Sequence, residues 1–321
     1  MPCLPERGHA DKTTGLNRSV CHNLAFSGRR RPEERPRREK KVLLFQQVSN
    51  SRVIKSKTSL VNGLSLLGAI IAIGLMATFG SIEPSLASTV LITGSSRGIG
   101  FEFARQYADK GWTVIATCRN PAGAHALNAL AAEQPNIIIE QLDVTDHGMI
   151  DALAKKYQDT PIDVLLNNAG INPGQQPQTF GAIDYDVYHR IIATNTTGPL
   201  KMAEAFVGHV AASEHKKIMT LTSGLGSLNA AERLPGILVP YRISKAGVNM
   251  AMLVISRAVK GRGIVVGTLE PGIVDTDQAA GMNVPKMSPE QAIAAMITVI
   301  ENFDADTSGL IYRYTGERAA W

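Results

Sequence analysis

The chain has 321 residues, of which 44% are hydrophobic, a composition typical of a globular protein and not of a disordered or collagen-like chain. The net charge of +5 is uneven, because residues 1–59 hold 14 Lys and Arg against 5 Asp and Glu, whereas residues 88–321 hold 19 basic and 22 acidic residues. This acidic part gives no electrostatic support for nucleic-acid binding. The three cysteines lie far apart and form no cluster with histidines, so neither a disulfide framework nor a metal site is expected.

The N-terminal part divides into two segments. Residues 1–59 carry clustered arginines with prolines between them and are predicted to be disordered. Residues 60–80 contain no charged residue and are long enough to cross a bilayer, which predicts a hydrophobic helix acting as a signal or a transmembrane anchor. Small residues at 85–87 resemble a signal-peptidase site, and preceding basic residues favour export of the remainder. The alternative is that translation starts at Met76.

From Thr89 onward, short β-branched runs alternate with helical stretches. The predicted strands are 89–93, 113–117, 137–142, 163–167, 218–222, 264–269 and 309–312. Most are apolar throughout, as parallel strands covered on both faces are. We therefore expect residues 88–321 to form one α/β domain, a Rossmann-type doubly wound parallel sheet of about seven strands flanked by helices. Asn120 and Pro121 are expected to begin the helix after the second strand.

The first predicted strand runs directly into a glycine-rich turn. Glycines at such a turn let the backbone approach a pyrophosphate, which the N-terminus of the following helix can bind. The spacing is G-x-x-x-G-x-G, not the usual G-x-G-x-x-G, so the turn alone is a weak indication. The candidate cofactor-binding residues here are Gly94, Ser96, Arg97, Gly98, Ile99 and Gly100.

The end of the second predicted strand favours NADP(H) over NAD(H). An acidic residue about 20 positions after the turn would bind the ribose 2′-hydroxyl of NAD. Arg119 ends this strand instead, and its guanidinium can pair with a 2′-phosphate, as can that of Arg97. The alternative is that both are solvated surface arginines.

Tyr241 and Lys245 are four positions apart, and so lie on one face of a predicted helix. A tyrosine that acts as a general acid needs a pKa below its ordinary value of about 10, and a nearby ammonium lowers it. The spacing is common by chance, so the alternative is a packed tyrosine beside a surface lysine.

These features belong to an ordered set, which is Thr93-Gly94…Gly98…Gly100, Asp143-Val144, Asn167-Asn168-Ala169-Gly170, Asn195, Thr222-Ser223, Tyr241…Lys245 and Pro271-Gly272…Thr276. Over residues 89–321 the set resembles the classical short-chain dehydrogenase/reductase family. Residues 116–121, residues 142–146 and the C-terminal Tyr-Thr-Gly-Glu-Arg-Ala-Ala-Trp further resemble the C-factor/sniffer-type carbonyl reductases.

The resemblance implies a catalytic role for four residues. Tyr241 would donate a proton to the substrate carbonyl oxygen as hydride leaves the nicotinamide. Lys245 would lower the tyrosine pKa and hold the nicotinamide ribose, and Ser223 would position the carbonyl oxygen. Asn195 would hold a water that links Lys245 to solvent. Hydrogen-bond donors that are already in position stabilise the negative charge that develops on the carbonyl oxygen during hydride transfer.

The resemblance also implies further cofactor contacts at later strand ends. They are Asp143 and Val144 at the adenine, Asn167, Ala169 and Gly170 at the cofactor floor, and Pro271, Gly272 and Thr276 at the nicotinamide amide and diphosphate. For the Asn-Asn-Ala-Gly run, a purely structural role is an equal alternative.

One spacing departs from the family pattern. Tyr241 follows Ser223 by 18 positions, and the intervening residues form an inserted loop that could make Ser227 the active hydroxyl instead. We favour Ser223, because it directly follows a predicted strand and so reaches the crevice at the strand end.

We therefore expect an NADP(H)-dependent oxidoreductase that reduces a small uncharged aldehyde or ketone to an alcohol. Apolar residues in the stretch 273–289 suggest the pocket wall. An alternative from another class is a catalytically weak NADP(H)-binding sensor or scaffold. The resemblance implies a homodimer through the helix of Tyr241. The domain is expected where NADPH is supplied, such as the cytoplasm, unless residues 60–80 anchor or export it.

Overall fold

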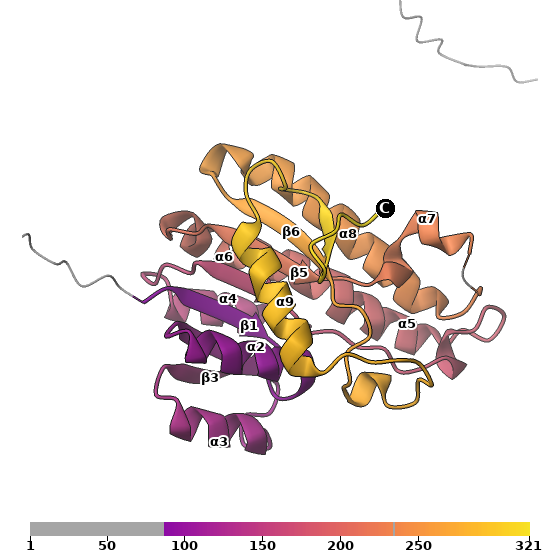
Figure 1. The fold of residues 1–321 in the computed structure, drawn as a ribbon, viewed down its shortest axis with the longest axis horizontal. Coiled ribbons are helices and arrows are strands. Elements are labelled where there is room, and N and C mark those ends of the chain that lie inside the picture. The colour runs from indigo at the N-terminus through magenta and orange to yellow at the C-terminus, as the bar shows by residue number, and fades with distance from the viewer. Residues whose placement is uncertain (1–86, 234) are drawn as a thin grey trace, which may run out of the picture. The chain divides into compact units, whose positions relative to one another are not determined.

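The computed structural model describes residues 87–233 and 235–321, which form one parallel sheet with helices on both faces (Figure 1). The strands are β1 (Thr89–Thr93), β2 (Thr113–Cys118), β3 (Ile137–Gln141), β4 (Val164–Asn167), β5 (Lys217–Leu221), β6 (Val265–Glu270) and β7 (Ile311–Arg313). Every predicted strand is confirmed, with ends that differ by at most two residues. The expected segments 1–59 and 60–80 lie outside the described residues, and no helix within the described ranges is long and apolar enough to cross a membrane.

The sheet has the strand order β3-β2-β1-β4-β5-β6-β7, with all neighbours parallel. The chain moves outward from β1 to β3 and then returns to place β4 on the other side of β1. The register sets Leu91 beside Ile115 in β2 and Leu165 in β4. The order therefore reverses between β1 and β4, and ligands of such sheets bind in the crevice beyond the carboxyl ends at this point.

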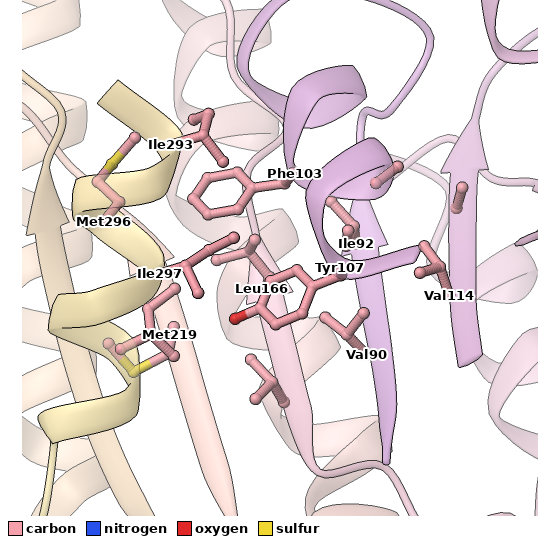
Figure 2. Close-up of a cluster of buried hydrophobic side chains, with 14 of the residues drawn as sticks. Val90, Ile92, Phe103, Tyr107, Val114, Leu166, Met219, Ile293, Met296 and Ile297 are labelled. Atoms are coloured by element: carbon pink, nitrogen blue, oxygen red, sulfur yellow. The ribbon is translucent and has the colours of Figure 1, made fainter. Parts of the chain in front are cut away.

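Helices α2 (Gly98–Asp109), α3 (His125–Glu133) and α9 (Pro289–Asn302) cover one face of the sheet, and α4 (His147–Lys156), α6 (Gly198–Ala212) and α8 (Val239–Val259) cover the other. Val90 and Ile92 pack on the first face, where Phe103 and Tyr107 of α2 meet α9 (Figure 2). Leu91 points to the opposite cluster. This alternation explains why the strands are apolar throughout, since both of their faces are covered.

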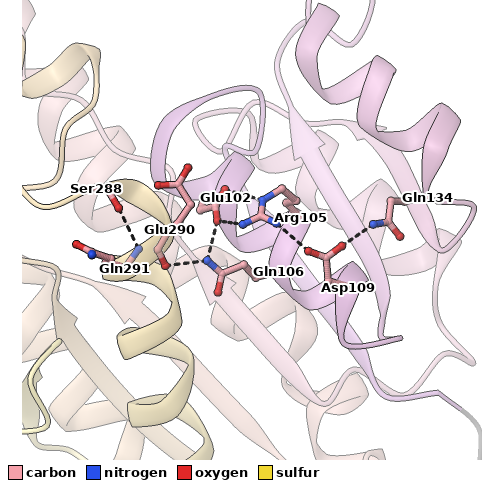
Figure 3. A network of polar contacts seen from close by, with 8 residues as sticks. All are labelled: Glu102, Arg105, Gln106, Asp109, Gln134, Ser288, Glu290 and Gln291. Atoms are coloured by element: carbon pink, nitrogen blue, oxygen red, sulfur yellow. Dashed lines mark hydrogen bonds and ion pairs between the residues drawn. The ribbon is translucent and has the colours of Figure 1, made fainter.

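Helix α2 is further fixed by a polar network (Figure 3). The Arg105 Nε donates to Glu102 at 2.9 Å and a second guanidinium nitrogen reaches Asp109 at 2.8 Å. The Gln106 side chain donates to the Glu290 carbonyl oxygen in α9 at 3.0 Å, and Gln134 donates to Asp109 at 2.6 Å. The network ties α2 to its neighbours, so the helix N-terminus is held at the crevice.

The predicted start of the helix after β2 was wrong. Helix α3 begins at His125, whereas Asn120 and Pro121 form a turn ahead of it. The Asn120 side chain accepts from the Gly123 N–H at 3.2 Å, and the Pro121 carbonyl oxygen accepts from the Ala124 N–H at 3.1 Å. Asn caps a turn in the same way as it caps a helix, so the local sequence could not distinguish the two.

Candidate active site

The glycine-rich turn joins β1 to α2 and has the backbone that a phosphate cradle needs. Gly94 and Gly98 have φ values of +73° and +60°, a region that favours glycine. A Cβ on Gly100 would lie 2.3 Å from the Gly94 carbonyl oxygen, so a side chain does not fit there. Helix α2 has no side-chain N-cap and no acidic residue in its first turn. Its first N–H groups and positive dipole end therefore suit an anion.

Asn168 fastens this turn to the end of β4. Its side-chain amide donates to the carbonyl oxygens of Thr93 at 2.7 Å and Gly94 at 3.0 Å. In return, the Thr93 hydroxyl accepts from the N–H groups of Asn168 and Ala169, each at 3.0 Å. Asn168 was not among the predicted contacts, although the Asn-Asn-Ala-Gly run pointed to this place.

A cavity of about 1050 Å³ opens along the crevice. The predicted cofactor residues that line it are Gly94, Ser96, Arg97, Gly98, Ile99, Gly100, Arg119, Asp143, Val144, Ala169, Gly170 and Thr276. The structure thus brings together the ends of β1, β2, β3 and β4 with the segment after β6.

Five predicted cofactor contacts are not in the cavity wall, namely Asn167, Pro271 and Gly272, and also Tyr241 and Lys245, which lie beside it. Asn167 is buried in β4 and donates to the Thr220 hydroxyl of β5 at 3.3 Å, so it joins two strands. Pro271 and Gly272 lie in the turn after β6, and a Cβ on Gly272 would lie 2.7 Å from the Tyr314 ring. Asn167, Pro271 and Gly272 therefore contact other parts of the fold and not the cavity. For Asn167, this is the structural role given above as the alternative for the Asn-Asn-Ala-Gly run.

The polar residues of the adenosine side have defined partners. Arg97 forms an ion pair with Asp277 across the mouth of the cavity, between exposed side chains. The Asp143 carboxylate accepts from the N–H of Thr145 at 2.9 Å and from its hydroxyl at 2.7 Å. Arg119 lines the cavity at the end of β2, where the sequence placed it.

Ser223, Tyr241 and Lys245 come together beside the cavity. Tyr241 and Lys245 are buried in the first turns of α8, and the Lys245 Nζ lies 5.8 Å from the centre of the Tyr241 ring. The Lys245 Nζ donates to the Leu221 carbonyl oxygen at the end of β5 at 3.0 Å. Ser223 follows that strand, and its side chain is close enough to the Tyr241 hydroxyl to oppose the rise in the pKa of that group. The carboxyl end of one strand, β5, thus meets one face of helix α8.

The wall residues Gly170 and Gln278 connect this group to the cavity. A Cβ on Gly170 would lie 3.7 Å from the Lys245 Nζ and 3.4 Å from the Asn195 Oδ1. Gln278 lies in the 3-10 turn η5 (Asp277–Ala279) and lines the cavity, and its side chain is close enough to the Tyr241 hydroxyl to oppose the rise in the pKa of that group. Sequence reasoning missed Gln278, because no local pattern shows that the segment after β6 folds over Tyr241.

Burial changes the acidity of both central groups. It lowers the pKa of Lys245 to about 8, because no carboxylate compensates for the loss of water around the ammonium. It raises the pKa of Tyr241, and hydrogen bonds from Ser223 and Gln278 oppose that rise. Lys245 is not among the groups that oppose it. Any lowering of the Tyr241 pKa by the Lys245 ammonium is therefore smaller than the rise that burial causes.

Ser223 and Ser227 have different partners. The Ser227 hydroxyl accepts from the Ala230 N–H at 3.1 Å and caps the short helix α7 (Leu228–Ala231). The Ser223 side chain accepts from the Leu225 N–H at 3.2 Å and reaches Tyr241. The geometry therefore favours Ser223 as the active hydroxyl.

Asn195 lies in a π-helical turn, η2 (Ala193–Thr197), between α5 (Tyr185–Ile192) and α6. Its Oδ1 accepts from the Ile171 N–H at 2.8 Å and its Nδ2 donates to the Ile171 carbonyl oxygen at 2.9 Å. The Nδ2 also donates to the Ser244 hydroxyl at 3.1 Å. The side chain therefore fixes the loop after β4, a positioning role that was not predicted.

Comparison with known proteins identifies this arrangement. A family model described as short chain dehydrogenase matches residues 88–286. The 1-hydroxy-2-glutathionyl-2-methyl-3-butene dehydrogenase of Rhodococcus sp. (strain AD45) is 33% identical over 238 residues, which cover 73% of this chain and 100% of that protein.

Solved structures with a similar fold belong to carbonyl reductases. The NADPH-bound carbonyl reductase from chicken fatty liver has a TM-score of 0.68 and 29% identity, covering 73% of this chain and 99% of that one. The carbonyl reductase Sniffer of D. melanogaster has a TM-score of 0.67 and 26% identity, covering 73% and 100%. The likeness to sniffer-type proteins is confirmed. The family match spans the glycine turn, β1 to β6 and the Ser223, Tyr241 and Lys245 group, and the chain therefore belongs to the short-chain dehydrogenase/reductase family of oxidoreductases.

Proposed function

We propose that the protein is an NADP(H)-dependent carbonyl reductase that converts a small uncharged aldehyde or ketone to an alcohol. The observation that carries the proposal is the meeting of Ser223, Tyr241 and Lys245 beside a cavity that a phosphate-type turn and Arg119 line. The two halves of the reaction, cofactor binding and proton transfer, thus adjoin in one crevice.

The residues present fit a nicotinamide dinucleotide. No Cβ fits at Gly100, and Gly94 and Gly98 have positive φ, so these three positions need glycine, as close approach of the backbone to a diphosphate does. The bound cofactor would supply the hydride. Arg119 and Arg97 would hold a 2′-phosphate, since no carboxylate ends β2 to accept from a free 2′-hydroxyl. The NADPH in the related chicken structure supports the choice of cofactor.

Tyr241 would protonate the carbonyl oxygen. Its phenol is protonated at neutral pH, which is the form that reduction needs, while burial opposes the lowered pKa expected of a tyrosine general acid. The Ser223 hydroxyl would donate to the same oxygen, so that two donors face the charge that develops there. Lys245 would hold the nicotinamide ribose and return a proton to Tyr241. The wall residues next to this group, Gly170, Ile171 and Gln278, carry no charge, which favours an uncharged substrate.

The decisive experiment compares wild-type protein with Tyr241→Phe in NADPH oxidation with a panel of aldehydes and diketones. Loss of the general acid should lower kcat/KM by about 10²- to 10⁴-fold. NADPH affinity, followed by fluorescence titration, should stay within about twofold, because the glycine turn and Arg119, and not the phenol, would hold the phosphates. Full activity of Tyr241→Phe would contradict the mechanism. Tight NADPH binding by wild-type protein without turnover of any substrate would instead support the sensor or scaffold.

A further inference from the structure

Tyr241 lies at a helix end that its neighbours in sequence do not cap. It is the third residue of α8, where a backbone N–H has no partner within the helix. The N-cap residue Leu238 has a left-handed backbone, with φ 57° and ψ 40°, and makes no side-chain cap hydrogen bond. The partner of the Tyr241 N–H must therefore come from elsewhere in the fold.

Gln178 supplies that partner from the loop between β4 and α5. It is fully buried, in the 3-10 turn η1 (Gln176–Gln178), and its Oε1 accepts from the Tyr241 N–H at 2.9 Å. Its Nε2 donates to the Asn172 Oδ1 at 2.8 Å and to the Gly174 carbonyl oxygen at 2.6 Å. Both amide hydrogens and the amide oxygen are thus used.

A second chain of hydrogen bonds holds the carbonyl side of Tyr241. The Ser244 hydroxyl donates to the Tyr241 carbonyl oxygen at 2.7 Å and accepts from the Asn195 Nδ2 at 3.1 Å. Asn195 in turn binds both backbone groups of Ile171. The two chains therefore start at opposite ends of the Tyr241 backbone and end on the same loop, residues 171–174.

That loop is part of the cavity wall, through Ile171 and Asn172 among others. Gln178 itself is fully buried and its amide is used entirely by protein partners, so it acts through Tyr241 and the loop. We propose that Gln178 is a positioning residue, which sets the Tyr241 hydroxyl relative to the wall that holds the substrate. The inference rests on the proposed function, because it concerns the tyrosine that protonates the carbonyl.

The test replaces Gln178 by Met, which keeps the side-chain length and removes every hydrogen bond. Gln176→Met is the matched control, because Gln176 is exposed on the same turn. In Gln178→Met, kcat for carbonyl reduction should fall by about tenfold or more, since small misplacement of a reacting group is costly. NADPH affinity should stay within about twofold, and the solvent deuterium isotope effect on kcat should rise as proton transfer becomes limiting.

Hydrogen exchange at the Tyr241 amide gives a readout that does not depend on activity. This amide should be protected in wild-type protein and in Gln176→Met, and should exchange faster in Gln178→Met. If wild-type protein reduces no carbonyl, the proposed function fails, whereas the exchange comparison still shows whether Gln178 holds Tyr241. Fast exchange of this amide in wild-type protein would overturn the inference directly.

Two other outcomes would also overturn it. One is an unchanged kcat in Gln178→Met despite faster exchange. The other is a parallel fall of kcat, NADPH affinity and thermal midpoint, which indicates a purely structural role. If Gln178→Met does not fold, Gln178→Glu takes its place, because a carboxyl retains the acceptor for Tyr241 and loses the two-donor amide that binds Asn172 and Gly174. It should keep the Tyr241 amide protected and lower kcat, and an unchanged kcat would refute the link to the wall.

Discussion

At the scale of single residues, the choice of cofactor depends on Arg119. A guanidinium at the end of β2 can form two charge-assisted hydrogen bonds with a 2′-phosphate, whereas a carboxylate would repel that phosphate and accept from a 2′-hydroxyl. Arg119→Asp should therefore lower the ratio of kcat/KM for NADPH to that for NADH by about 10- to 100-fold. This factor corresponds to the free energy that a hydrogen bond to a charged group contributes.

Steady-state kinetics with both cofactors would measure this ratio. Arg257→Asp makes the same change of charge at an exposed position of α8 outside the cavity wall, and should leave the ratio unchanged. An equal shift in both variants would show that net charge, and not the position of Arg119, decides the preference.

Ser223 sets the pH dependence of the tyrosine. Alcohol oxidation needs the Tyr241 phenolate, so its rate should rise with pH up to the raised pKa of this group, whereas reduction should be flat through neutral pH and fall only above it. Because the Ser223 hydrogen bond opposes the rise, Ser223→Ala should move the controlling pKa further upward, by about one unit or less.

The pH profile of kcat for oxidation would show the shift. Ser227→Ala removes the cap of α7 without touching Tyr241 and should keep the wild-type midpoint. A downward movement in Ser223→Ala would mean that the serine hydroxyl stabilises the phenol and not the phenolate.

At the scale of elements, the strands were predictable because most of them are apolar runs covered on both faces, whereas the edge strands β3 and β7 are partly exposed. Phe103 and Tyr107, four positions apart, lie on the buried side of α2. The start of α3 was not predictable, since the Asn120 side chain accepts a hydrogen bond within a turn and does not cap the helix. The π-helical turn around Asn195 was not predictable either, because its hydrogen bonds to Ile171 and Ser244 join segments far apart in sequence.

One helix depends on a buried lysine. The Lys217 Nζ, at the start of β5, donates to the carbonyl oxygens of Ile300 at 2.7 Å and Glu301 at 2.8 Å, which end α9. The last carbonyls of a helix lack partners and attract cations. Lys217→Met would remove this partner from both carbonyls and leave Ile300 with only the Phe303 N–H at 3.2 Å, and should lower the free energy of unfolding by about 1–3 kcal/mol.

Chemical denaturation of both this variant and Lys110→Met would check the difference. Lys110 pairs with the Glu301 side chain at 2.8 Å, but both side chains are largely exposed, so its loss should cost about 0–1 kcal/mol. Similar losses in the two variants would refute a special role for the buried cap.

At the scale of the whole molecule, the site is a product of topology. The glycine turn, Arg119 and the Tyr241–Lys245 pair were visible as local patterns, and the strand order brings most of them to one cavity. The parts that the sequence did not reveal are side chains whose partners are distant, namely Asn168, Gln178 and Gln278. A side-chain amide can donate to or accept from almost any polar group. Its partner is therefore known only once the tertiary structure shows which segments of the chain lie beside it.

The ion pair between Arg97 and Asp277 spans this crevice from the first turn to the segment after β6. A phosphate would compete with the Asp277 carboxylate for the Arg97 guanidinium. Asp277→Asn should therefore tighten NADPH binding, by about fivefold at most, because an exposed pair contributes about 0–1 kcal/mol. The gain should shrink as salt rises from about 0.1 to 0.5 M, since screening weakens exposed pairs.

Fluorescence titration of NADPH at both salt concentrations would measure the effect. Asp275→Asn is the matched control, because Asp275 lies two residues away, is also exposed and pairs with Lys286 at 3.4 Å instead. An equal gain in Asp275→Asn would mean that the phosphate responds only to the net charge of the loop. Weaker binding in Asp277→Asn would mean that the carboxylate orients Arg97 toward the phosphate, and the pair would then assist cofactor binding instead of competing with it.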